Sequence, residues 1–328
     1  MNKLFILLPA MCLPLITCQQ SRNEILLATI TPREMCGTVQ FSDGCGEQMD
    51  SSIAYGIALI HHMTFEEAEP IFDKIRSEDP DCFWGHWGKA MSFIHPLWPD
   101  QPSAEQLEQG FRLSQRALNL AKNEREKAFG KAIAAYYTDG ATKTEKARLA
   151  SMEMIFKEAY ENRPGDTEIA AFYAVIMLST IPAEDKTYEK QGKASDIAES
   201  IIKIIPDHPG AFHYAIHAND FPPLAEKAIL VARNYGKIAP EIPHALHMPS
   251  HIFTRRGLWE ESIEWNKRSS AASIKRLPNG EGSSHNLHAS DYMVYGLLQI
   301  GKDLEAEGIY DKITASTTPF QDIAACAY

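Results

Sequence analysis

Hydrophobic positions recur with the three-to-four residue spacing of amphipathic helices along most of this 328-residue chain. Alternating β-branched patterns are scarce, and proline or glycine returns at intervals of about one helix length. The clearest unit covers residues 49–81, in which small residues such as Gly56 allow two predicted helices to approach closely. Phe72 would fill the space between them, and Pro80 would end the second helix because proline cannot continue it. The pattern therefore predicts paired helices rather than strands.

Helix endings of the same kind recur further along the chain. Pro206 and Pro240 lie 34 residues apart, although the unit before them is longer. Thirty-four residues is the period of the tetratricopeptide repeat, a helix–turn–helix unit. We therefore predict an all-α fold, a right-handed α-α superhelix of tetratricopeptide-like hairpins, over residues 48–328. Two stretches depart from the period, a proline-rich break at 96–102 and a loop insertion at 277–284.

The first residues have the features of an export signal. Lys3 is the only charge in the leader, and the apolar run at 4–16 is too short to span a bilayer comfortably. Cys18 ends this run in a sequence that resembles a bacterial lipobox, in which the cysteine is lipidated, although a threonine precedes it here. A plain signal peptide is the alternative. We predict a leader at 1–18 and an irregular segment at 19–47, in an exported bacterial protein of the periplasm or the outer membrane.

Composition sets limits on function. The formal net charge is −11, which argues against nucleic-acid binding because phosphate recognition needs a basic surface. The sequence contains no P-loop and no dinucleotide-binding fingerprint. No segment after the leader is long and apolar enough to cross a membrane, so we expect membrane contact only through a lipid anchor at Cys18. The chain stops within an apolar helical pattern at 322–328, and we expect it to be a truncated form of a longer protein.

The cysteines offer one candidate disulfide. Cys36 and Cys45 flank a glycine-rich stretch, and in an exported protein a disulfide could close this short loop. Two separate thiols in an irregular segment are the alternative. Cys82 and Cys326 fall in helical patterns, where we expect them to be small buried apolar residues.

Histidines are concentrated in one part of the chain. Eight of the twelve fall within residues 208–288, and two pairs, His213 with His217 and His247 with His251, are 34 residues apart. Residues four apart lie on one face of a helix, about 5–6 Å apart at Cβ. Repeating the pair one period later places imidazoles from neighbouring first helices on the same side. We therefore predict that these histidines point into one groove of the superhelix.

Imidazole is the commonest transition-metal ligand near neutral pH, so a metal site is one interpretation. Neither pair carries the glutamate of the zinc proteases, and Pro249 between the second pair removes a backbone donor. A second interpretation is a groove for a peptide or a carboxylate, with Tyr214 and Arg255 as further contacts. A third is a structural polar core, as we expect for His61 and His62. The candidate ligands for Zn, Cu or Fe are His213, His217, His244, His247, His251, His288 and Asp291.

Several of these segments resemble a family of exported bacterial tetratricopeptide-repeat proteins. The resemblance extends over about residues 48–328 and is most specific at 208–256. It implies an α-solenoid with a shared histidine motif, and no particular activity. The segments that carry it are His208-Pro209-Gly210-Ala211-Phe212-His213-Tyr214, Ile216-His217-Ala218, His244-Ala245-Leu246-His247-Met248-Pro249-Ser250-His251-Ile252 and His285-Asn286-Leu287-His288.

We expect an exported binding scaffold that holds a peptide or protein in its concave groove, where the histidine-rich site carries a metal ion. The alternative is a metal-dependent hydrolase or oxidoreductase. The paired histidines would then be the ligands, and Asp291 or His288 would be the base. The two interpretations differ in geometry. An enzyme site needs an open coordination position and a substrate pocket, whereas groove histidines can be spread over many ångströms.

Overall fold

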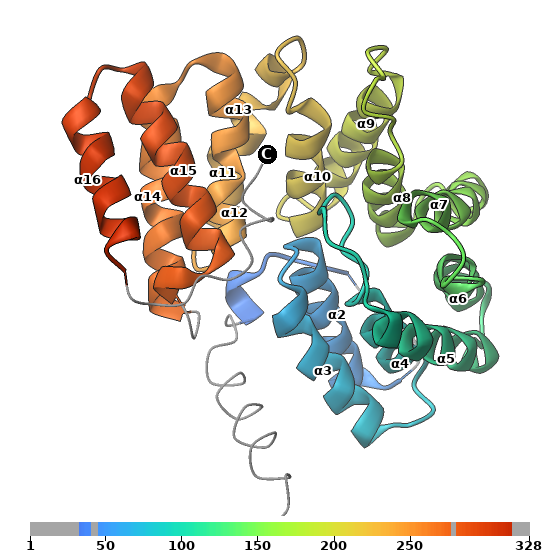
Figure 1. Ribbon diagram of the computed structural model, residues 1–328. Coiled ribbons are helices and arrows are strands. Elements are labelled where there is room, and N and C mark those ends of the chain that lie inside the picture. The colour runs from blue at the N-terminus through green and yellow to red at the C-terminus, as the bar shows by residue number, and fades with distance from the viewer. Residues whose placement is uncertain (1–32, 41–44, 277–279, 317–328) are drawn as a thin grey trace, which may run out of the picture.

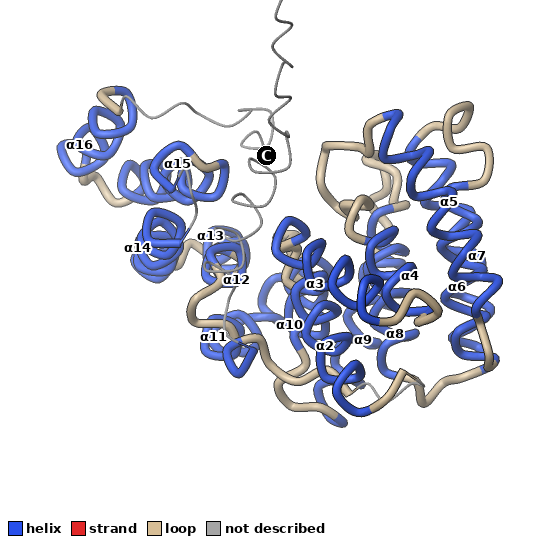
Figure 2. Tube along the Cα trace, turned by 90° about the horizontal axis from the view of Figure 1, so that it is seen from below, coloured by secondary structure: helices blue, strands red, loops and turns tan. Residues whose placement is uncertain are grey.

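The computed structural model describes residues 33–40, 45–276 and 280–316. Every regular element within these ranges is a helix (Figure 2), and none of these helices is long and apolar enough to cross a membrane. The leader with Cys18 and the C-terminal stretch with Cys326 lie outside the described residues. The elements are η1 (Arg33–Met35), α2 (Glu47–His61), α3 (Phe65–Glu78), α4 (Phe83–Met91), α5 (Ala104–Leu120), α6 (Glu124–Tyr137), α7 (Glu145–Asn162), α8 (Thr167–Ser179), α9 (Glu189–Ile204), α10 (Pro209–Asn219), η2 (Ala225–Ala228), α11 (Ile229–Ile238), α12 (Pro243–His247), α13 (Pro249–Arg256), α14 (Trp259–Arg276), η3 (Gly280–Gly282), α15 (Ser284–Gln299) and α16 (Asp303–Thr314).

Consecutive helices pack as hairpins that stack along the chain (Figure 1). Polar side chains fix where several helices begin: Ser103, Asp166 and Ser283 each accept a hydrogen bond from a backbone N–H of the first turn. Gly257 ends α13 in the left-handed backbone conformation, with φ 68°. The predicted all-α, tetratricopeptide-like superhelix is confirmed.

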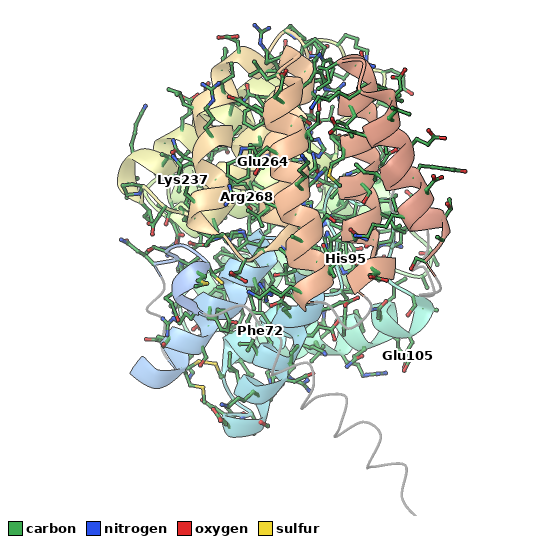
Figure 3. The ribbon with its side chains drawn as sticks, turned by 90° about the vertical axis from the view of Figure 1, so that its left-hand side faces the viewer. Phe72, His95, Glu105, Lys237, Glu264 and Arg268 are labelled. Atoms are coloured by element: carbon green, nitrogen blue, oxygen red, sulfur yellow. A yellow bond between two sulfur atoms is a disulfide. The ribbon has the colours of Figure 1, made fainter. Side chains whose placement is uncertain are left out.

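The first hairpin shows why the sequence forms this repeat. Phe72 of α3, labelled in Figure 3, is fully buried, and its ring lies against Gly56 of α2 and Gly88 of α4. A Cβ atom on Gly56 would stand 2.6 Å from the ring, and one on Gly88 would stand 2.1 Å from it. Because a side chain at either glycine would collide with the ring, three helices can meet around one aromatic residue. The repeat predicted at 49–81 is therefore confirmed.

The superhelix closes on itself, because α2 packs against α10 (Figures 1 and 2). His61, at the end of α2, makes the central contact. Its Nε2 atom donates to a carboxylate oxygen of Glu168 in α8 at 2.8 Å. Its Nδ1 atom then accepts from the hydroxyl of Tyr214 in α10, also at 2.8 Å. Gly210 makes room for this imidazole, since an added Cβ atom would lie 2.6 Å from Nδ1.

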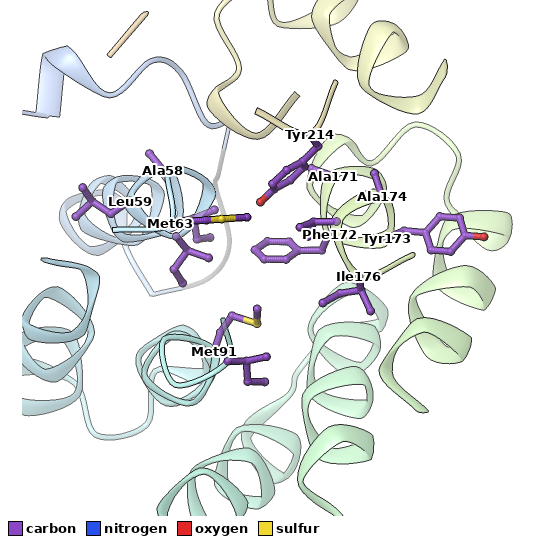
Figure 4. Packing of buried hydrophobic residues seen from close by; sticks show 14 of the residues in the cluster. Ala58, Leu59, Met63, Met91, Ala171, Phe172, Tyr173, Ala174, Ile176 and Tyr214 are labelled. Carbon is purple, nitrogen blue, oxygen red and sulfur yellow. The ribbon is translucent and has the colours of Figure 1, made fainter. Parts of the chain in front are cut away.

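Apolar side chains fill the interior of this closed ring. Phe172 projects from α8 between α2 and α4, near Met63 and Met91 (Figure 4). Every residue of α8 from Glu168 to Leu178 is buried, so this stretch of the helix has no solvent-facing side. The long concave groove expected from the sequence is thus replaced by a packed core along α2 to α10. A cavity is present further along, where α10, α12, α13 and α15 meet.

The predicted cysteine pairing is wrong. Cys45 forms a disulfide with Cys82, and the bond joins the segment before α2 to the start of α4. The backbone carbonyl of Cys36 accepts a hydrogen bond from His62, and burial raises the pKa of the Cys36 thiol to about 12. Cys82 is buried in the core, as expected, but it is half of a disulfide rather than a separate apolar side chain. The true partners are 37 residues apart, so they meet only when the first hairpin has folded.

Candidate metal centre

All six predicted histidine ligands meet where α10, α12, α13 and α15 come together. They form two groups of three rather than one group of four. Within each group, one ring nitrogen per residue lies within 4.8 Å of the others. Each predicted pair belongs to a different group and is completed by one histidine from the next hairpin. We name the groups triad 1, which comprises His213, His217 and His244, and triad 2, which comprises His247, His251 and His288.

Three of the ligands come from one interrupted helix. α12 ends at His247, and α13 begins at Pro249, which cannot donate a backbone hydrogen bond. Met248 between them keeps helical dihedrals, with φ −52° and ψ −36°, so the helical path continues across the break. His244, His247 and His251 therefore stay at helical spacings of three and four on one side. The interruption predicted at Pro249 is present, but it does not separate the ligands.

Hydrogen bonds around triad 1 turn a lone pair inward. His213 Nδ1 lies 2.6 Å from the main-chain oxygen of His61, which only accepts, so Nδ1 carries the proton and Nε2 the lone pair. That Nε2 atom lies 3.1 Å from Nε2 of His217 and 3.1 Å from Nε2 of His244. One in-plane lone pair thus faces two neighbouring ring nitrogens. A cation among the three nitrogens would satisfy all of them together.

The tautomers of triad 2 are fixed on two of its rings. Asn266 donates its amide N–H to the Ser262 carbonyl, so its Oδ1 atom faces His247 Nδ1 as an acceptor, at 2.7 Å. His251 Nδ1 lies 2.8 Å from a carboxylate oxygen of Asp220. Both Nδ1 atoms therefore donate to these outer partners, and the Nε2 atoms of His247 and His251 face each other at 2.9 Å. Outer hydrogen bonds of this kind orient metal-ligating histidines.

Burial keeps most of these imidazoles neutral. Burial, and then the neighbouring His251, lowers the pKa of His217 to about 3. Burial also holds the pKa values of His213, His244 and His247 well below 6.5, and other imidazoles of the cluster add to the effect. Neutral imidazole is the form that binds metal ions. Protons therefore compete weakly for these nitrogens at neutral pH.

A cavity of about 350 Å³ lies against both triads. Its wall includes His217 and His244 of triad 1, and His251 and His288 of triad 2. Trp98 also lines it, with its ring centroid 5.4 Å from that of His244. This tryptophan belongs to the proline-rich break, which rises from the N-terminal helices toward α10 (Figure 1). Apolar and charged side chains complete the wall, among them Leu178, Ile181, Phe221, Met248, Lys186 and Arg255.

The other candidates from the sequence lie outside the triads. Asp291 is exposed on α15 and belongs to neither triad. Tyr214 is buried within the closed ring and does not line the cavity. Arg255 does line it, and its Nε atom donates to Asp220 at 2.8 Å. His285, which the sequence did not mark as a ligand, lies in the cavity wall beside triad 1.

A third group of ligating atoms is a buried hydrogen-bond network. Glu168 accepts from Nε2 of His61 at 2.8 Å and from Nε2 of His208 at 2.9 Å. His208 Nδ1 accepts in turn from the backbone N–H of Ala211. Because these nitrogens already have protein partners, we assign the group to ring closure rather than to metal binding. His208 therefore does not point into the groove as predicted, whereas His61 and His62 are structural, as predicted.

Sequence reasoning missed the residues that hold the histidines in place. Asp220 follows His217 by three residues, and an acidic residue one turn after a candidate ligand indicates a hydrogen-bond partner for the site. Asn266 comes from α14, the second helix of its hairpin, and no pattern linked it to the site. Trp98 was visible only as part of a proline-rich break. Outer-shell residues are hard to find because they follow no metal-ligand spacing.

No family model matches the chain, and no curated protein matches it. A point mutant of MamA matches 58% of this chain and 98% of its own, with 12% identity and a TM-score of 0.41. A human IFIT1 dimer with m7Gppp-AAAA has 12% identity and a TM-score of 0.44, over 82% of this chain and 60% of its own. Likenesses this distant carry no argument about function, and the fold assignment rests on the helices themselves.

Proposed function

We propose that this protein is a helical scaffold that binds a transition-metal ion through its histidine cluster, at the wall of a cavity for a small molecule. The observation that carries the proposal is the convergence of imidazole lone pairs. In triad 1, the Nε2 lone pair of His213 faces Nε2 of His217 and of His244 at 3.1 Å each. In triad 2, the outer partners of His247 and His251 turn both Nε2 atoms toward each other at 2.9 Å. A cation held among such nitrogens interacts favourably with all of them.

The donor set supports particular ions. Imidazoles suit Zn, Cu or Fe, whereas Mg, Ca and Mn prefer oxygen ligands. Three histidines per ion also leave a coordination position for water or substrate, as in catalytic zinc sites. Because both triads border the cavity, that position faces a space that a small molecule can enter.

The shape of the site favours a small molecule over an extended peptide. A cavity of about 350 Å³ lies within the range of small-molecule sites. Core side chains occupy the inner face of α2 to α10, so a peptide or protein partner would have to present one side chain or one terminus to the cavity. We therefore infer metal-dependent binding or turnover of a small molecule. Arg255 in the wall suits an anionic group on that molecule.

Metal analysis of the untagged protein tests the proposal. We expect at least one equivalent of a transition metal per chain, and none in the double variant His213→Ala/His247→Ala, which removes a central ligand from each triad. After chelation, added Zn or Cu should raise Tm, because a ligand at 100 times its Kd stabilises the native state by about 2.7 kcal/mol.

A matched control separates loss of metal from loss of any histidine. His86→Ala removes an imidazole of α4 that donates to the Pro80 carbonyl, and the variant should keep the metal. Wild-type protein that is metal-free and gains no thermal stability from Zn, Cu or Fe would overturn the proposal. A proton shared between His247 and His251 would then account for their contact.

We also propose that the protein is exported. The leader-like sequence at 1–18 supports this, and so does the bond between Cys45 and Cys82, because disulfides form in oxidising compartments. Lipid attachment at Cys18 would anchor the chain to a membrane. Cell fractionation with palmitate labelling should place label on wild type and not on Cys18→Ser. A reduced protein in the cytoplasm would contradict export.

A further inference from the structure

We propose that triads 1 and 2 form a single two-ion centre, in which both ions face one cavity and share a bridging anion. This inference rests on the proposed metal binding and deepens it, because it fixes the number of ions and their relation.

The two triads are immediate neighbours. The ring centroids of His217 and His251 are 6.2 Å apart, and those of His244 and His247 are also 6.2 Å apart. Aromatic rings at this separation pack against each other without an intervening side chain. His244 and His247 are three residues apart on α12, so a rise of about 4.5 Å along the helix sets the offset between the triads. Two ions held by these rings lie within reach of one small bridging group.

The same elements serve both triads. α12 carries one ligand of triad 1, His244, and one of triad 2, His247. α10 carries two ligands of triad 1 and is followed directly by Asp220, whose carboxylate orients His251 of triad 2 at 2.8 Å. A shift of α10 or α12 therefore alters both groups together. Filling one triad fixes helices that the other triad also needs, which favours binding of the second ion.

Both triads open onto the same space. The cavity wall includes His217 from triad 1 and His288 from triad 2. Each triad supplies three ligands, so each ion keeps at least one position for a further donor. An anion with two donor atoms, such as a carboxylate or azide, can fill both positions. Arg255 lies in the same wall with its Nε–H donated to Asp220, and its other guanidinium N–H groups can donate to that anion.

Titration of metal-free protein with Cu²⁺ tests this arrangement. We expect wild type to bind two equivalents, with an integrated electron paramagnetic resonance signal of at most half the bound copper, because neighbouring spins couple. Added azide should bridge the pair, lower the signal further and produce a new absorption band. The single-triad variants His217→Ala and His288→Ala should each bind one equivalent with full signal and lack the bridging band.

The possible results separate this inference from the proposed function. Two equivalents with full signal, and no response that depends on both triads, would overturn the two-ion centre while leaving metal binding intact. Binding of only one equivalent of copper by wild type, lost in just one of the two variants, would likewise overturn the two-ion centre and leave metal binding intact. No bound copper at all would overturn both proposals. Circular dichroism of the variants excludes misfolding as the cause, and His86→Ala again serves as the control that retains both ions.

Discussion

Replacing Gly210 by alanine tests how the closed ring positions the metal centre. The added methyl carbon would stand 2.6 Å from Nδ1 and 2.9 Å from Cγ of His61. This imidazole cannot swing away freely, because Tyr214 and Glu168 hold its two nitrogens. Either α2 and α10 must separate, or the ring must leave its partners. Separation of α2 from α10 would also move the His61 carbonyl that accepts the hydrogen bond from His213.

The expected cost follows from these contacts. Overpacking by extra methyl groups costs about 1–3 kcal/mol. Loss of a buried hydrogen bond costs about 1–3 kcal/mol more. The better helix propensity of alanine offsets at most about 1 kcal/mol of this cost. We therefore expect Gly210→Ala to lower the free energy of unfolding by roughly 1–5 kcal/mol. Metal affinity should fall about 10–100-fold, as it does when an outer partner of a ligand is disturbed.

Urea denaturation of metal-free protein, followed by circular dichroism, measures the first effect, and copper titration measures the second. Gly192→Ala is the matched control, because Gly192 lies in α9 and an added Cβ atom would meet nothing within 4 Å. It should stabilise the protein by about 0.5–1 kcal/mol. If Gly210→Ala proved as stable as Gly192→Ala, the close contact with His61 would be refuted as a feature of the fold.

Three further predictions concern other parts of the molecule. Phe72→Ala should lower the free energy of unfolding by about 3–5 kcal/mol, because it leaves a cavity between three helices, and chemical denaturation measures this. Burial lowers the pKa of His62 to about 3 in the folded state. The unfolded chain therefore takes up this proton first, and stability should fall by about 1.4 kcal/mol per unit as pH drops below about 6.5. Denaturation curves measured from pH 7 to 4 give the free energy of unfolding at each pH, and its slope against pH should be shallower by that amount in His62→Gln. Reducing the bond between Cys45 and Cys82 should lower stability by about 2–4 kcal/mol, while a thiol reagent should label Cys36 only on unfolding.

The helical hairpins were predictable because their determinants are local. Gly56 and Phe72 lie on the two helices of one hairpin, and their sizes alone indicate how these helices pack. Closure of the ring was not predictable in this way. The bond from His61 to Glu168 joins residues 107 positions apart, and it depends on the curvature accumulated over the intervening hairpins. The disulfide between Cys45 and Cys82 could not be predicted for a related reason, since the two cysteines meet only in the folded hairpin.

The histidine cluster was predictable as a set but not in its internal arrangement. Helical spacing and the repeat period place the paired histidines on one side, and the register of the last repeat added His288. The same register gave Asp291 as a ligand, yet α15 presents this residue to solvent. The division into two triads depends on which imidazoles of one hairpin contact those of the next. These contacts depend on the rotation of α10, α12 and α15 about their axes, which the repeat period does not specify.

Ring closure and metal site are parts of one arrangement. A superhelix that holds an extended peptide keeps its inner face open, whereas here Phe172 and its neighbours fill that face. Closure brings the end of α2 against α10, and the His61 carbonyl then fixes the proton of His213 on Nδ1, 152 residues along the chain. The inward lone pair of triad 1 is thus a consequence of a contact made by the first hairpin. A substitution that opens the ring should therefore change the metal centre even where it touches none of the six histidines.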